Sequence, residues 1–312
     1  MQHFVTVVCD KQWGYATGSG VYDHLDSVSF MAIPCPGFVF DNWSTGDTTN
    51  TITIEVICDT TLTAYFRIDS AAMKLNTLNF TAVGGPASVR LIQYDTPASI
   101  SLQYSTDSST CWNNYPIDST LQLAAGETVY LKATKANATF SKNEYNYYNF
   151  IMTGIVSANG NIMSLLDELM LMDTVPQYAF HYLFENCQSL IKAPELPAMT
   201  MSAHCYEGMF SECTSLSYAP DLPATNLAPY CYLDMFYNCS NIRINSTSSS
   251  SRQMAILSGK PWSIPADAVA KTDWNKDMLA NTGGSFTGDP EIGVTYNTDL
   301  LLSLLKRTLA LY

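Results

Sequence analysis

The 312-residue chain has little charge of either sign and an excess of acid. Only 14% of its residues are charged, and 28 acidic residues outnumber 15 basic ones. No basic cluster occurs, which argues against nucleic acid and anionic membranes as partners, because both are bound by cationic side chains gathered on one face. No run of about 18 apolar residues occurs either, so we expect no membrane insertion. Hydrophobic residues make up 47% of the chain, enough for substantial cores.

Catalytic and cofactor motifs are also missing. The Gly-Ser-Gly at residues 18–20 reads as a turn rather than a nucleophile elbow, and phosphate-binding and dinucleotide-binding glycine patterns are absent. Glu195 and Asp221 fall at one repeat phase, so they do not form the facing pair of a glycosidase. The four histidines have no second ligand at metal spacing: His3, His24, His181 and His204. We expect no enzyme activity, no cofactor and no metal.

The start of the chain carries no evident secretory signal. Residues 1–4 run directly into a β-like stretch, without a basic region or a long apolar core. We therefore expect the chain to stay in the cell that makes it, or to leave by another route such as phage lysis.

Residues 179–242 repeat with a period of 26. Such a period, with apolar residues in phase, is typical of a solenoid in which equivalent side chains stack from turn to turn. Ala193-Pro194 also recurs as Ala219-Pro220. Nine in-phase residues are predicted to form the repeat core: Phe184, Cys187, Leu190, Phe210, Cys213, Leu216, Phe236, Cys239 and Ile242.

Nine cysteines are present, five of them within the repeats. Their positions follow the period, and their spacing matches no usual zinc site. We interpret them mainly as reduced, packed thiols, with some disulfide formation as the alternative.

Residues 1–70 alternate apolar and polar residues between turn signals, which indicates short strands. The segments Gly37–Trp43 and Asp59–Phe66, with Asn50 between them, resemble the bacterial surface repeat of the Listeria–Bacteroides type. The resemblance implies a small β-grasp-like module that acts as a spacer in surface proteins and has no enzymatic role.

Residues 71–158 are predicted to form a β-sandwich, because candidate strands recur at short, regular spacing. The stretches Ile100–Asp107, Cys111-Trp112 and Ala125–Tyr130 resemble sandwich modules of gut Bacteroidetes surface proteins and their phages, including crAss-like phages. Residues 145–150 combine Tyr and Asn, which suits contact with sugars. Tyr145, Tyr147 and Tyr148 are therefore the candidate ligand-binding residues. The alternative is an ordinary strand that buries Tyr148 and Phe150 and leaves Tyr147 outside.

Residues 159–246 are expected to contain a capping helix, at 161–173, and three repeats. The helix would cover the open end of the solenoid. The repeat unit at Cys205–Ala224, and its copies at Cys231–Cys239 and Ala179–Cys187, resembles the BspA-type leucine-rich repeat. That resemblance implies one short strand per turn and the role of an adhesin or surface protein.

Residues 247–312 are predicted to be a C-terminal cap or anchoring region that ends in an α-helix over Asp299–Tyr312. Its many leucines predict burial, either on the last repeat or in an oligomeric or virion-anchoring interface. The expected fold is thus mainly β and multi-domain: a β-grasp-like module, a β-sandwich, a short leucine-rich-repeat solenoid and an α-helical tail.

Two functional hypotheses follow. The first is a non-enzymatic structural or adhesion protein on the virion surface of a Bacteroidetes-infecting phage, associated with head or tail. The second is a BspA-like adhesin on a bacterial cell surface. The expected partners are other virion or surface proteins, a glycan or protein receptor, and further copies of the chain bound through the C-terminal helix.

Overall fold

Short strands and turns dominate the chain. The computed structural model describes residues 1–298 except 12, 36–37, 70–75, 96–98, 107–110, 138–139, 171 and 246–260. The chain divides into two units, Met1–Leu75 and Asn76–Tyr312. They are called unit 1 and unit 2 below, and each is described by itself.

Unit 1 is built from two antiparallel-rich sheets. One has the order β3-β1-β7-β5 and the other the order β2-β4-β6, and β1 pairs with β7 in parallel. The strands are β1 (Gln2–Cys9), β2 (Gly14–Thr17), β3 (Gly20–Asp23), β4 (Ser27–Pro34), β5 (Phe38–Trp43), β6 (Thr51–Glu55) and β7 (Thr60–Ile68). Alternation along the longer strands, such as β1 and β7, buries one face of each, as the two-residue period of a half-buried strand requires. Trp43 is 1% exposed in this core, and its indole Nε1 donates to the Thr49 carbonyl at 3.1 Å.

Unit 2 begins with a β-sandwich. A six-stranded sheet has the order β11-β10-β13-β8-β15-β17, and a three-stranded sheet has the order β12-β9-β14. The strands are β8 (Asn79–Ala82), β9 (Ala87–Gln93), β10 (Leu102–Ser105), β11 (Asn113–Tyr115), β12 (Thr120–Leu123), β13 (Thr128–Ala133), β14 (Tyr148–Thr153), β15 (Val156–Asn159) and β17 (Leu190–Lys192). The last strand comes from the repeats, so the sandwich and the repeats share a sheet and one hydrophobic core.

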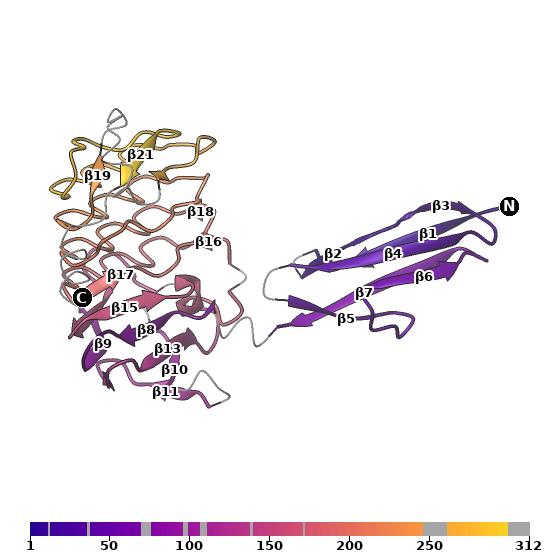
Figure 1. The fold of residues 1–312 in the computed structure, drawn as a ribbon, viewed down its shortest axis with the longest axis horizontal. Helices are drawn as coiled ribbons and strands as arrows, with labels where there is room; N and C mark the ends of the chain where they lie inside the picture. Colours follow the sequence, from indigo (N-terminus) through magenta and orange to yellow (C-terminus); the bar gives the residue numbers. More distant parts are fainter. Residues whose placement is uncertain are drawn as a thin grey trace, which may run out of the picture. The chain divides into compact units, whose positions relative to one another are not determined.

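The repeats stack as coils on the sandwich (Figure 1). Four segments lie side by side: 178–186, 204–212, 230–238 and 273–281. Alternate backbone N–H groups of each segment donate to carbonyls of the next, as Phe184 does to Met209 at 2.8 Å and Phe210 to Met235 at 2.9 Å. The remaining N–H groups close turns within their own segment. Short parallel strands β16 (Thr174–Val175) and β18 (Thr200–Met201) add a second line of pairing.

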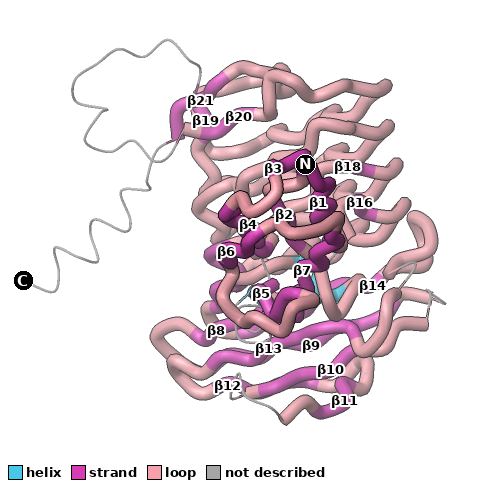
Figure 2. The backbone as a smooth tube through the Cα atoms, turned by 90° about the vertical axis from the view of Figure 1, so that its right-hand side faces the viewer, coloured by secondary structure: helices cyan, strands magenta, loops and turns pink. Residues whose placement is uncertain are grey.

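The fourth coil departs from the 26-residue period. Asp234 N–H donates to the Lys276 carbonyl and Phe236 N–H to the Met278 carbonyl, so the third and fourth coils are 43 residues apart rather than 26. Strands β19 (Ile244–Asn245), β20 (Trp262–Ser263) and β21 (Thr295–Thr298) form a small sheet at this end of the stack (Figure 2).

Aromatic ladders run through the coils. The rings of Phe184, Phe210 and Phe236 stack nearly parallel, with centroids 5.4 and 5.7 Å apart. Phe150 of β14 continues this ladder into the sandwich, stacked on Phe184 at 5.1 Å. A second ladder joins Phe180, Tyr206 and Tyr232 at 5.8 and 6.1 Å.

Strand β14 bonds to the first coil in the same way as each coil bonds to the next. Its Phe150 N–H donates to the Leu183 carbonyl at 2.7 Å, the bond that Phe184 and Phe210 make one coil further on. The thiol of Cys187 donates to the Phe150 carbonyl at 2.9 Å, and those of Cys213 and Cys239 bond the corresponding phenylalanine carbonyls at 3.0 and 2.9 Å. The sandwich therefore provides the template on which the repeats pack.

The α-helical part of the expected fold is wrong. The described residues contain no α-helix beyond an isolated helical residue at 76, and a single 3₁₀-helix, η1 (Ile162–Leu165), stands where a capping helix was expected over 161–173. Residues 162–165 are fully buried, so their apolar run reflects burial on all sides rather than an amphipathic helix. The described part of the C-terminal region is strand and turn. The helix expected over 299–312 lies outside the described residues.

Candidate functional site

A cluster of tyrosine, histidine and carboxylate side chains lies at one edge of the coil stack. We call it the tyrosine face. It is partly exposed, and it contains the residue that follows β9, a residue of the segment that leads into β14, and residues of the first three coils: Tyr94, Tyr147, Tyr178, His181, Tyr182, Glu185, His204, Glu207 and Tyr230.

One part of this face is a column of stacked rings that recur with the 26-residue repeat period. Tyr178, His204 and Tyr230 occupy the same position in successive coils, all with positive φ. Their rings stack with centroids 4.6 and 4.9 Å apart and interplanar angles of 9° and 23°. Both flat faces of the His204 imidazole are thus covered by tyrosine rings.

The sandwich supplies a second group of rings. Tyr94 stacks on Tyr147 with centroids 4.7 Å apart, and Tyr147 meets Tyr182 edge-on at 5.6 Å. His181 joins the two groups, since its ring lies 4.1 Å from that of Tyr182 and 5.6 Å from that of Tyr178. The face therefore exists only where the sandwich and the coils meet.

Two histidines converge on one carboxylate. Oε2 of Glu207 is hydrogen-bonded to Nδ1 of His204 and lies 3.6 Å from Nδ1 of His181. His181 is completely buried, and neither of its ring nitrogens has a hydrogen-bond partner of ordinary geometry among the described residues. Burial lowers the pKa of His181 to about 4, although the backbone carbonyl of Glu144 opposes the shift. His181 is therefore neutral at physiological pH.

Several carboxylates act on the phenol of Tyr182. Burial, and after it the nearby carboxylates of Glu207, Glu185, Asp234 and Glu144, together raise the pKa of Tyr182 to about 12. Burial also raises the pKa of Glu185 and of Glu207, the latter against the opposing effect of His204. These carboxyl groups are thus partly desolvated, which strengthens any charge interaction that they make.

Gly208 makes room for the Tyr182 ring. It occupies the position in the second coil that Tyr182 occupies in the first, with φ +57°. A Cβ at Gly208 would lie 1.9 Å from Cε1 of Tyr182. The glycine thus satisfies two requirements, a left-handed backbone conformation and the close approach of the ring.

The three tyrosines predicted to bind a ligand have different environments. Tyr145 is 69% exposed beside the tyrosine face, and Tyr147 lies within the face. Tyr148 is 2% exposed and packs in the core against Phe140, with ring centroids 5.2 Å apart. Only Tyr145 and Tyr147 can therefore contact a ligand. The nine predicted repeat-core residues lie in the core of unit 2, none more than 2% exposed.

Sequence reasoning missed the coil residues of the face. The sequence analysis predicts no ligand role for His181 and His204, and it does not single out Glu207. An available signal was the recurrence of an aromatic side chain at 178, 204 and 230 with the repeat period. The contribution of Tyr94 and Tyr147 had no such signal, because only the folding of the sandwich against the first coil brings them there.

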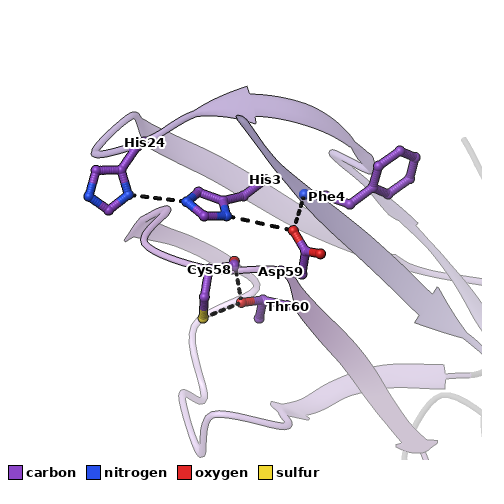
Figure 3. Close-up of polar contacts among 6 residues, drawn as sticks. All are labelled: His3, Phe4, His24, Cys58, Asp59 and Thr60. Carbon is purple, nitrogen blue, oxygen red and sulfur yellow. Dashed lines mark hydrogen bonds and ion pairs between the residues drawn. The ribbon is translucent and has the colours of Figure 1, made fainter. Parts of the chain in front are cut away.

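Unit 1 holds a separate polar cluster (Figure 3). Nε2 of His3 lies 3.1 Å from Nδ1 of His24, and Nδ1 of His3 lies 3.6 Å from Oδ1 of Asp59. The same carboxylate oxygen accepts the Phe4 backbone N–H at 2.8 Å. These contacts join β1 to the segments that follow β3 and precede β7, and they account for the placement of His3.

All nine cysteines are free, and the five in the repeats are buried. Burial raises the pKa of Cys187, Cys205 and Cys213, which makes these thiols unreactive. Within the described ranges no group of three or more His, Cys, Asp or Glu side chains is arranged to hold a metal ion.

Comparison with known proteins identifies one part of the chain. Residues 5–70 match the family model of the divergent InlB B-repeat domain. This supports the predicted repeat of the Listeria–Bacteroides type and is compatible with an adhesin-like surface protein. No curated protein and no solved structure matches the chain significantly. Among the described residues, no helix is long and apolar enough to cross a membrane.

The Gly208→Ala variant tests the close packing of the face. We expect it to destabilise unit 2 by roughly 2–5 kcal/mol, since a left-handed alanine costs about 1–2 kcal/mol and overpacking a further 1–3. Gly84→Ala is the matched control, because Gly84 also has positive φ but open space at its Cβ. Urea unfolding followed by circular dichroism would measure both. Equal effects of the two substitutions would contradict the packing of Tyr182 on Gly208.

The buried neutral His181 predicts acid sensitivity. Because its pKa is lowered to about 4, the unfolded chain binds more protons than the native chain between about pH 6.5 and pH 4. The stability of unit 2 should therefore fall by roughly 3 kcal/mol over that interval. His181→Phe should remove this loss, while His24→Phe in unit 1 should leave it unchanged. An unaltered acid loss in His181→Phe, measured by urea unfolding at pH 7, 5.5 and 4.5, would contradict the assignment.

Proposed function

We propose that this chain is a non-enzymatic, adhesin-like surface protein. Unit 1 serves as a spacer or presentation module, and unit 2 carries the tyrosine face, which contacts a receptor. The main support for the proposal is the match of residues 5–70 to the divergent InlB B-repeat domain.

The contact role of unit 2 is supported by the composition of its tyrosine face. Tyrosine rings combine a large contact area with a polar tip, and they lose little conformational entropy when they bind. Here several rings are already held in place by stacking, as Tyr147 is by Tyr94. Such preorganisation lowers the entropic cost of binding a receptor.

The finer assignments rest on sequence resemblance. The BspA-type leucine-rich repeat is supported by the recurring Met-Phe-x-x-Cys pattern, whose side chains stack as ladders. The position on a phage virion is supported by the likeness of the sandwich segments to modules of gut Bacteroidetes and their phages. The bacterial cell surface is the alternative location. In either setting the partners are neighbouring surface or virion proteins and a glycan or protein receptor.

Protease shaving of intact cells, beside peptide mass spectrometry of purified phage particles, tests the proposal. We expect peptides from unit 2 in one of these two fractions. Stoichiometric recovery in virions would assign the protein to the particle, and recovery only from shaved cells would assign it to the bacterial surface. Recovery only from the interior of lysed cells would contradict a surface role.

A further inference from the structure

Two histidines of unit 1 lie with a ring nitrogen of each facing the other (Figure 3). His3 is on β1, and His24 directly follows β3, where its backbone N–H donates to the Met1 carbonyl at 2.8 Å. Nε2 of His3 and Nδ1 of His24 are 3.1 Å apart. The pairing of β1 with β3 therefore brings together two imidazoles that are 21 residues apart along the chain.

The separation of these two nitrogens suits a metal ion. Zinc binds an imidazole nitrogen at about 2.0–2.1 Å, so two such ligands on one ion lie about 2.9 Å apart at a right angle and about 3.3 Å apart at the tetrahedral angle. The 3.1 Å between His3 and His24 lies between these values. The two nitrogens share a hydrogen bond, which a bound ion would replace. His3 is buried and His24 is exposed, so only the exposed ring has to turn for both lone pairs to meet at one ion.

Asp59 is the second polar neighbour of the His3 ring. Its Oδ1 lies 3.6 Å from Nδ1 of His3 and accepts the Phe4 backbone N–H at 2.8 Å, which holds the carboxylate in place. A carboxylate beside one imidazole nitrogen favours the tautomer that carries the proton there, and it leaves the other nitrogen with a free lone pair. Carboxylates orient the histidine ligands of metal ions in this way. Nε2 of His3 is thus prepared to bind an ion on the side of His24.

The chemistry of the pair selects the kind of ion. Imidazole is a ligand of zinc, copper and nickel, whereas magnesium and calcium prefer oxygen ligands. In the part of the chain that the structure describes, no third His, Cys, Asp or Glu completes a ligand set, so the remaining coordination positions are left to water. These positions face solvent, because His24 is exposed.

We propose that His3 and His24 form a binding site for a divalent transition-metal ion of the zinc and copper type, with Asp59 as the positioning residue of His3. The ion accepts one lone pair from Nε2 of His3 and one from Nδ1 of His24. It links β1 to the segment that follows β3, and it stabilises unit 1 because it binds the folded state. The site is separate from the tyrosine face and does not depend on the surface role proposed above.

Isothermal titration calorimetry with zinc chloride, on the purified full chain without an affinity tag, tests the proposal. We expect one zinc ion to bind per chain, and this binding to be lost in His24→Phe. Asp59→Asn should weaken it about tenfold or more, the effect usual for a residue that orients a metal ligand. An excess of magnesium chloride should not compete, because magnesium prefers oxygen ligands.

Cys58→Ser is the matched control, because Cys58 is an exposed thiol beside Asp59 that can itself attract zinc. Its Sγ lies 3.7 Å from Oγ1 of Thr60, and we expect the variant to bind zinc as the wild-type chain does. Loss of binding in Cys58→Ser would assign the ion to the thiol and overturn the proposal. Absence of zinc binding by the wild-type chain, or equal affinity of the wild-type chain and His24→Phe, would also overturn it.

Thermal unfolding distinguishes a lost site from a lost fold. His24→Phe alters an exposed side chain, so we expect the variant to fold. Zinc should raise the unfolding temperature of unit 1 in the wild-type chain and not in His24→Phe, and an equal rise in both would contradict the site. A failure of these titrations leaves the surface role intact, because that role is judged by protease shaving and virion composition.

Discussion

Hydrogen bonds between neighbouring coils fix the register of unit 2: a ladder of backbone bonds and, at three cysteines, a thiol bond to the phenylalanine carbonyl one coil earlier. Cys187, Cys213 and Cys239 make this bond at 2.9–3.0 Å. It aligns the phenylalanine rings, and the aligned coils in turn bring Tyr178, His204 and Tyr230 into one column. The 43-residue spacing between the third and fourth coils keeps the same pattern of bonds, because the additional residues lie between the two bonded segments. The tyrosine face thus depends on a register set in the core.

The sequence allowed the repeat core to be predicted, because the period places equivalent side chains in equivalent environments. It did not reveal the fourth coil, where Trp274 and Leu279 replace the Cys and Phe of the motif after an irregular spacing. The helix expected over 161–173 failed for a different reason. A segment buried on every side is apolar throughout, and its spacing then carries no information about helix or turn.

The candidate site was less predictable than the fold. Tyr147 was found from its local sequence, but its partners Tyr94 and His181 are 53 and 34 residues away along the chain. The burial that keeps His181 neutral and desolvates Glu207 comes from packing between the sandwich and two coils. No local pattern encodes such an environment, so only the three-dimensional arrangement shows that these side chains lie together.

The central claim is that strand β14 is the template for the coil stack. Hydrogen–deuterium exchange of the wild-type chain and of Phe150→Ala, read by mass spectrometry, tests it most directly. We predict that truncating Phe150 lowers the protection of the coil amides at 178–186 and 204–212 together with that of β14, while unit 1 is unchanged. Loss of protection confined to β14 and its sandwich neighbours would contradict the claim.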